Sequence, residues 1–153
     1  MQRLILLRHA EAERQSLSGD DFDRGLTPAG RAEAEAVGRR LAELGYRPDL
    51  VLVSTARRAN ETWAALEAAF PGVRVEPEPD LYEASPKALL SAAEQAGEAG
   101  TVMLVAHNPG LHSLAVRLGA TGPLASGLPT AHAAVFAFDP WARTPSFEAL
   151  VAP

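Results

Sequence analysis

The chain begins with the apolar run Arg3-Leu4-Ile5-Leu6-Leu7, and Arg8-His9-Ala10-Glu11 comes directly after it. The run is too short for a helix and ends in charged side chains, as is typical of a buried strand in a parallel sheet. In α/β proteins, functional groups gather at the carboxyl ends of such strands. Arg8 and His9 are therefore candidate functional residues. Whether they belong to a site depends on the residues at the ends of the other strands.

Two more runs have the same character, Leu50–Val53 and Thr101–Ala106, and segments with helical spacing separate the strands. Helices are predicted to begin at Thr27-Pro28, Ser85-Pro86 and Asn108-Pro109, because a capping oxygen is followed by a proline that suits the first turn. The other expected elements are a helix with Ala59, Trp63, Leu66 and Phe70 on one face, a short strand at 73–75, and two closing strands at 133–138 and 146–151.

This alternation predicts an α/β fold with three layers (α/β/α). The central sheet would be mostly parallel, with helices on both faces and antiparallel strands at the C-terminus. Residues 1–153 are expected to form a single domain, since this length suffices for one hydrophobic core.

The composition excludes several classes of function. The chain has 14 lysine and arginine residues against 19 aspartate and glutamate residues, a formal net charge of −5, which argues against a nucleic-acid partner. It has no cysteine, so disulfides, thiolate metal sites and a cysteine nucleophile are excluded. No segment approaches about 18 apolar residues. We therefore expect neither a leader nor a membrane span, and a cytoplasmic protein; the sequence does not set the oligomeric state.

Three predicted strand ends carry groups that bind phosphate. The first ends in Arg8-His9, the second in Ser54 with Arg57 and Arg58 in the next helical turn, and the fourth in His107. In a parallel sheet these ends lie at one edge. Arginine binds phosphate oxygens through two N–H groups, and helix N-termini add backbone donors. The pattern predicts a site for a phosphoryl group.

Two histidines suit phosphoryl transfer. A neutral imidazole can attack phosphorus and hold the phosphoryl group as phosphohistidine, and neighbouring arginines oppose its protonation. A second histidine, when protonated, can donate to the phosphoryl oxygens as charge accumulates there. His9, next to Arg8, is the predicted nucleophile, and His107 is the predicted stabilising group.

Four ordered motifs resemble the histidine phosphatase superfamily, also called the phosphoglycerate mutase-like family. They are Leu6-Leu7-Arg8-His9-Ala10, Leu26-Thr27-Pro28-Ala29-Gly30, the run from Ser54 to Thr62, and Val105-Ala106-His107. The compact length is similar to that of the short, SixA-type phosphohistidine phosphatases. The resemblance covers nearly the whole chain and implies a phosphatase that needs no cofactor.

The resemblance also assigns roles to single residues. The family's nucleophile falls on His9, its phosphate-binding arginines on Arg8 and Arg58, and its second histidine on His107. Arg58 matches the pattern Ser-x-x-x-Arg-Ala, whereas Arg57 does not. Three further residues are candidates for substrate binding: Arg24, at a basic position of the short branch, Arg57 and Asn108. For Arg24 a salt bridge within its loop is the alternative, and for Arg57 a solvent-facing position.

The chain departs from the family in one respect. Larger members have an inserted segment with a carboxylic acid that protonates the leaving oxygen, and this chain is too short to contain it. Glu83 is the nearest candidate acid, with an ordinary loop carboxylate as the alternative. A P–N bond can be protonated on the leaving imidazole itself, so we hypothesise a preference for phosphoramidates or good leaving groups.

Other phosphate chemistries lack their signatures. Asp21-Phe22-Asp23 does not follow an apolar strand, so we set aside an aspartyl-phosphate mechanism. No paired histidine spacing indicates a metal site, and no P-loop is present.

The expected partner is a phosphorylated protein or a small phosphorylated metabolite. A metabolite phosphatase, a phosphoglycerate mutase-like enzyme and a non-catalytic phosphate-binding module remain alternatives. Loops 15–25, 77–85 and 119–131 would determine specificity.

Overall fold

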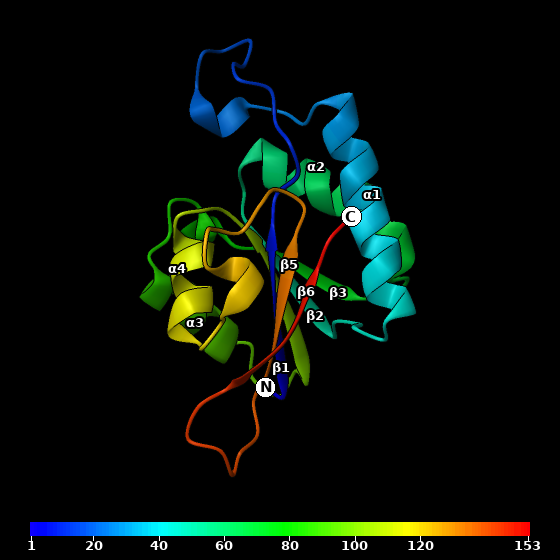
Figure 1. Ribbon diagram of the computed structural model, residues 1–153. Helices are drawn as coiled ribbons and strands as arrows, with labels where there is room; N and C mark the ends of the chain where they lie inside the picture. The colour runs from blue at the N-terminus through cyan, green and yellow to red at the C-terminus, as the bar shows by residue number, and fades with distance from the viewer.

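A computed structural model describes residues 1–153, except for the side chain of Pro123. Strands and helices alternate along the chain (Figure 1). The strands are β1 (Arg3–Arg8), β2 (Leu50–Val53), β3 (Arg74–Pro77), β4 (Thr101–Ala106), β5 (Ala133–Ala137) and β6 (Ser146–Val151). The α-helices are α1 (Pro28–Glu43), α2 (Arg57–Leu66), α3 (Pro86–Glu94) and α4 (Gly110–Arg117), and short 3-10 turns are η1 (Asp21–Asp23), η2 (Glu67–Ala69), η3 (Pro79–Leu81) and η4 (Gly122–Leu124).

The six strands form one sheet in the order β3-β2-β4-β1-β5-β6. The first four run parallel, β5 pairs antiparallel with β1, and β6 pairs antiparallel with β5. The predicted mixed sheet, parallel in its centre and antiparallel at its C-terminal strands, is confirmed.

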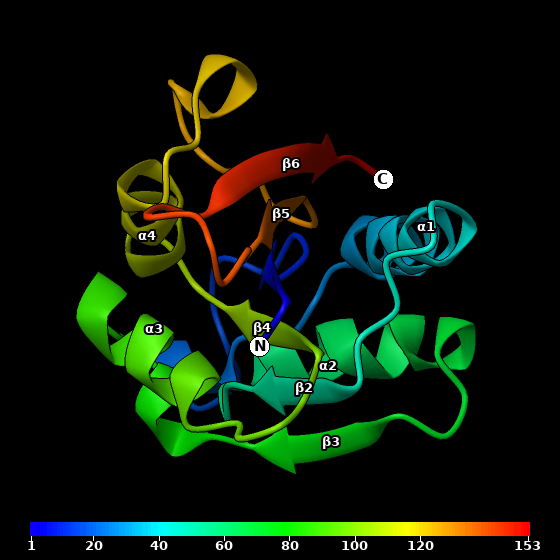
Figure 2. The same ribbon diagram turned by 90° about the horizontal axis from the view of Figure 1, so that it is seen from below.

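Helices cover both faces of this sheet (Figure 2). Along β1, Leu4 and Leu6 belong to the core beneath α3 and α4, while Ile5 and Leu7 belong to the core beneath α1 and α2. All four side chains are completely buried. Because successive strand residues point to opposite faces, a continuous apolar run fits a sheet covered on both sides. The predicted three layers are confirmed.

Two of the three predicted helix starts are confirmed. The Thr27 hydroxyl accepts from the Gly30 N–H at 2.9 Å, and the Ser85 hydroxyl accepts from the Ala88 N–H at 3.1 Å. The predicted N-cap at Asn108 is wrong, since α4 begins at Gly110 with Pro109 as its N-cap. The Asn108 side chain still bonds to the start of α4, since its Oδ1 accepts from the His112 N–H at 3.3 Å, while its Nδ2 donates to the Leu128 carbonyl at 2.8 Å.

Other boundaries shift by a few residues. β3 begins at Arg74 and ends at Pro77, and α2 gives way to η2 after Leu66, although the predicted apolar face through Phe70 is buried. Within the residues described, no helix combines the length and the apolar character that crossing a membrane requires.

Candidate active site

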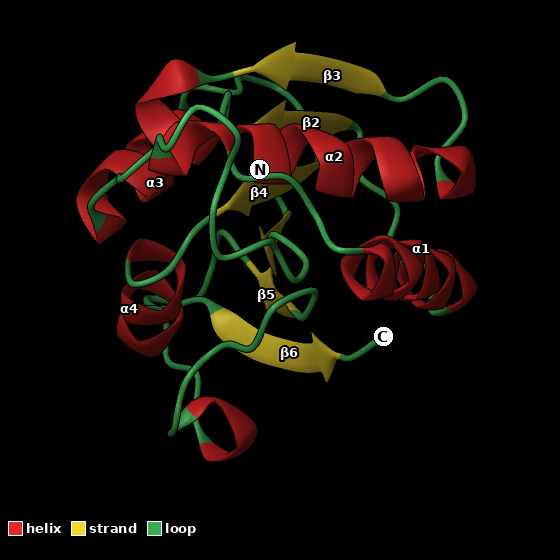
Figure 3. Cartoon of the chain, turned by 90° about the horizontal axis from the view of Figure 1, so that it is seen from above, coloured by secondary structure: helices red, strands yellow, loops and turns green.

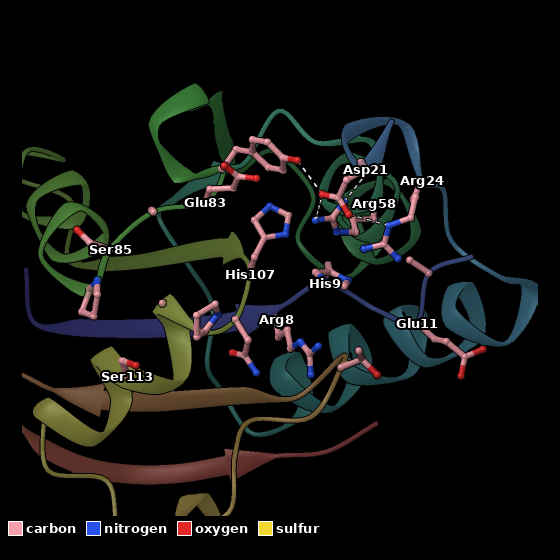
Figure 4. Close-up of a pocket in the computed structure, with 18 residues that line it drawn as sticks. Arg8, His9, Glu11, Asp21, Arg24, Arg58, Glu83, Ser85, His107 and Ser113 are labelled. Atoms are coloured by element: carbon pink, nitrogen blue, oxygen red, sulfur yellow. Dashed lines mark hydrogen bonds and ion pairs between the residues drawn. The ribbon is translucent and has the colours of Figure 1, made fainter. Parts of the chain in front are cut away.

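A cavity of about 790 Å³ opens at the edge of the sheet where the parallel strands end. Figure 3 views the molecule from this side, and Figure 4 shows the cavity itself. Its wall contains all the residues predicted for the site except Arg57: Arg8, His9, Arg24, Arg58, Glu83, His107 and Asn108.

The predicted nucleophile, His9, is buried just beyond β1, with 7% of its surface exposed. Its Nδ1 lies 2.7 Å from the Ala10 carbonyl. A carbonyl oxygen only accepts, so Nδ1 carries the proton and Nε2 keeps its lone pair. Burial, together with the charges of Arg58 and Arg8 and against the bond to the Ala10 carbonyl, lowers the pKa of His9 to about 4. Nε2 is therefore unprotonated at neutral pH.

His107 follows β4, and its ring centroid lies 5.3 Å from that of His9. Its Nε2 lies 2.7 Å from the Ser54 hydroxyl, which accepts from the Ala56 N–H at 3.3 Å. Among the described residues the buried Ser54 hydroxyl has no other acceptor for its proton, so it donates to Nε2 and the His107 proton lies on Nδ1.

From the sequence, His107 is expected to act when protonated, but in the structure its side chain is neutral. Burial, followed by the effect of His9, lowers the pKa of His107 to about 3. His107 is therefore neutral at pH 7 and would donate to an anion through Nδ1–H rather than as an imidazolium.

Three buried side-chain nitrogens in the described residues have no hydrogen-bond partner: Arg8 Nε, Arg58 Nε and His107 Nδ1. They come from β1, α2 and the residue after β4, and all three side chains line the cavity. Buried donors are normally paired, because an unpaired one has lost its hydration without compensation. Three such donors around one cavity are arranged so that they could bind an anion.

Both arginines are anchored at the outer end of the guanidinium. Arg8 donates through Nη1 to the Leu128 carbonyl at 3.1 Å. Arg58 donates through Nη1 to the Asp21 carbonyl at 2.8 Å and through Nη2 to the Asp21 carboxylate at 3.0 Å. These contacts leave each Nε–H unused and hold the two side chains in place before any ligand arrives.

The sequence analysis missed the role of Asp21. Its carboxylate accepts from the Tyr82 hydroxyl at 2.7 Å and from Arg24 Nε at 2.9 Å, in addition to Arg58. The Tyr82 bond is the main cause that lowers the pKa of Asp21 to about 2, with further contributions from both arginines. Asp21 therefore stays ionised and positions Arg58.

Thr62 is a second residue that the sequence analysis missed. Its buried hydroxyl donates to the Arg58 carbonyl at 2.7 Å and accepts from the Ala10 N–H at 2.9 Å. It thereby links the first turns of α2 to the peptide after His9 and fixes the spacing between the two predicted catalytic elements.

The remaining predicted residues divide into those inside and outside the cavity. Arg24 lines the wall and also forms the loop salt bridge with Asp21. Glu83 lines the wall from an exposed position with φ +55°, a conformation that is rare for a non-glycine residue and often found at functional sites. Arg57 lies outside, because its side chain is 54% exposed and is paired with Glu61 at 3.2 Å.

Among the residues that the structure describes, no group of three or more histidine, aspartate or glutamate side chains is arranged to hold a metal ion.

The chain is similar to known proteins in both sequence and fold. A family model of the histidine phosphatase superfamily (branch 1) matches residues 4–95. A crystal structure from Agrobacterium tumefaciens, assigned to the phosphohistidine phosphatase SixA, superposes with a TM-score of 0.88 and 36% identity over 99% of both chains. The protein histidine phosphatase SixA complexed with tungstate, at 24% identity, has the same fold, with a TM-score of 0.83 over 99% of this chain and 97% of that one.

Other relatives are longer proteins. The mitochondrial serine/threonine-protein phosphatase PGAM5 of Xenopus tropicalis is 34% identical over 85 residues, which are 56% of this chain and 30% of that protein. The chain spans about a third of the length of the curated relatives it matches.

Proposed function

The chain belongs to the histidine phosphatase superfamily, branch 1, and we propose that it is a SixA-type phosphatase acting through a phosphohistidine on His9. The observation that carries this proposal is the set of three unpaired buried donors, Arg8 Nε, Arg58 Nε and His107 Nδ1, in one cavity with the unprotonated Nε2 of His9. A module that only bound phosphate would have no use for that lone pair.

In the first step, His9 Nε2 attacks phosphorus and forms a P–N bond while the bond to the leaving group breaks. The leaving group takes the bonding electrons, and its proton comes from a water molecule in the open cavity. The donors of Arg8, Arg58 and His107 stabilise the charge on the phosphoryl oxygens, and they are held in place beforehand, so little reorganisation is needed.

In the second step, a water molecule attacks the phosphorus of phospho-His9. The P–N bond breaks, its electrons return to Nε2, and inorganic phosphate leaves. The bond from His9 Nδ1 to the Ala10 carbonyl is compatible with both steps, since Nδ1 never gives up its proton.

We propose a phosphohistidine on a protein as the substrate. Glu83, the candidate acid, is an exposed carboxylate on the cavity wall. A leaving imidazole accepts a proton on its own nitrogen, so its departure needs little help from an enzymic acid. The likeness to the SixA-assigned structure from Agrobacterium tumefaciens supports the same substrate class.

The test compares a phosphohistidine-bearing protein, an aryl phosphate and an unactivated alkyl phosphate, each with wild type and His9→Ala. We expect turnover of the first two, slow turnover of the third, and loss of all activity in His9→Ala. Fast turnover of the alkyl phosphate with slow turnover of phosphohistidine would contradict the substrate and favour a metabolite phosphatase. Inactivity of wild type on every phosphate would favour a binding module.

A further inference from the structure

The charged side chains on the cavity wall cancel one another. Three are arginines, and three are carboxylates: Arg8, Arg24, Arg58, Glu11, Asp21 and Glu83. His9 and His107 add no charge at neutral pH, because burial lowers the pKa of both far below 7. A phosphoryl dianion therefore brings the cavity to a net charge of about −2, before the rest of the substrate is counted.

Each arginine on the wall is already engaged. Arg58 and Arg24 both pair with Asp21, and Arg24 also donates through Nη1 to the Glu13 carbonyl at 2.9 Å. Arg8 is bound to the Leu128 carbonyl. The donors that remain on Arg8 and Arg58 face the phosphoryl position. Arg24 is the remaining cation on the described wall, and the Asp21 carboxylate already offsets its charge, so a second anionic group of the substrate meets little uncompensated positive charge there.

The three carboxylates lie on different sides of the cavity (Figure 4). Glu83 stands beside His107 and Asp21 lies above Arg58, whereas Glu11 lies farther from the histidines, where its carboxylate accepts from the Thr27 hydroxyl at 2.9 Å. The Asp21 side chain is 51% exposed, and Glu11 and Glu83 are also exposed. A leaving group that projects from the phosphoryl site meets these negative charges at the mouth of the cavity.

We propose that this acidic rim, defined as Glu11, Asp21 and Glu83, selects the leaving group by its charge. The favoured substrate is a phosphohistidine whose neighbouring groups are uncharged or basic, and phosphorylated carboxylic acids are disfavoured. This inference rests on the proposed function. A carboxylate on the leaving group would take the cavity to about −3, whereas an ammonium group would bring it to about −1.

The test uses three aryl phosphates of similar size: 4-methylphenyl, 4-(carboxymethyl)phenyl and 4-(aminomethyl)phenyl phosphate. The methylene spacer keeps the acidities of the leaving phenols similar, so that charge is the main difference among them. We expect kcat/KM to be highest for the ammonium compound and lowest for the carboxylate, with a ratio on the order of tenfold at low salt. Added salt should reduce the ammonium-to-carboxylate ratio of kcat/KM, because it screens the charges.

Two variants locate the effect. Glu83→Gln and Glu11→Gln should each reduce the ammonium-to-carboxylate ratio, and comparing substrates within one enzyme cancels any general loss of rate. Glu35→Gln is the matched control, because it removes the same charge from an exposed position on α1 outside the cavity wall. It should leave the ratio unchanged.

The outcomes separate this inference from the proposed function. The acidic-rim selection alone is overturned if activity still requires His9 but kcat/KM is equal for the three compounds or highest for the carboxylate. It is also overturned if Glu35→Gln reduces the ammonium-to-carboxylate ratio as much as the rim variants do. Wild type inactive on all three compounds, or activity that survives in His9→Ala, overturns the proposed function and this inference with it.

Discussion

The cavity around His9 and a second depression beside Arg57 are neighbours, with Glu11 and Ala12 in both walls. The second is larger, at about 1080 Å³ against about 790 Å³, and it too contains arginines. Arg57 and Arg58 are adjacent in sequence, yet the first has a 54% exposed side chain paired with Glu61 and the second a 7% exposed side chain with an unpaired Nε.

This difference shows what makes an anion site in this fold. Size and arginine content do not distinguish the two depressions, whereas buried donors that are anchored at one end and unpaired at the other do. An ion bound to such donors is shielded from water, so each hydrogen bond is stronger than at an exposed arginine.

The largest effect should come from His9→Ala. Removing the nucleophile is expected to reduce kcat for an aryl phosphate by about 10,000-fold or more. His112→Gln is the control, since His112 is bonded to the Leu124 carbonyl and does not line the cavity. Equal losses of kcat in His9→Ala and His112→Gln would show that residues on the cavity wall matter no more for the rate than residues outside it.

The adjacent arginines give the most direct comparison of the two depressions. Arg58→Ala should reduce kcat/KM on the order of 100- to 1000-fold, as does the loss of a preorganised donor to a transition state. Arg57→Ala should stay within about threefold, because exposed ion pairs contribute little. Steady-state kinetics on one aryl phosphate measures kcat/KM for both variants. A large loss of kcat/KM in Arg57→Ala would contradict the difference that we infer between the two arginines.

A smaller effect is expected at Ser54, which touches His107 but not the substrate. Ser54→Ala removes the donor that keeps the His107 proton on Nδ1, and the resulting mixture of tautomers should lower kcat about tenfold. Ser54→Thr should restore part of the rate, since it keeps a hydroxyl. Phosphate affinity should change less than kcat, and an unchanged kcat in Ser54→Ala would contradict this role.

The last prediction concerns stability rather than rate. His9 and His107 have pKa values of about 4 and about 3 in the folded state, against about 6.5 in an unfolded chain. Between these values the unfolded state binds more protons, so the free energy of unfolding should fall as the pH drops from about 7 towards 4. Denaturant unfolding measures this slope, which should be shallower in His9→Gln/His107→Gln. An identical slope in that variant would contradict the desolvation of the two histidines.

Much of the fold could be predicted because its signals are local. Leu50–Val53, Thr101–Ala106 and Ser146–Val151 form strands with the expected bounds, since apolar runs and their flanking residues mark them. His9 and His107 come together because parallel strand ends share one edge. The predicted helix start at Asn108-Pro109 is one residue too early, since α4 begins at Gly110, and the Asn108 side chain bonds to both the His112 N–H and the Leu128 carbonyl.

The rest of the site depends on contacts between distant segments. Asp21 lies 37 residues before Arg58, and nothing in the run Asp21-Phe22-Asp23 indicates that its carboxylate holds an arginine. Thr62 looks like any polar residue on a helix until its bond to the Ala10 N–H is known. A buried arginine such as Arg58 is normally paired, but the sequence does not show which acidic residue is its partner.

Trapping the phosphoenzyme tests the central claim most directly. Wild type and His9→Ala would be mixed with a labelled aryl phosphate, quenched within one turnover, and the phosphorylated residue identified. Because Nδ1 of His9 donates to the Ala10 carbonyl, we predict an acid-labile, alkali-stable adduct on Nε2 of His9 that is absent in the variant. An alkali-labile adduct, an adduct that persists in His9→Ala, or phosphorylation on Nδ1 would contradict the account.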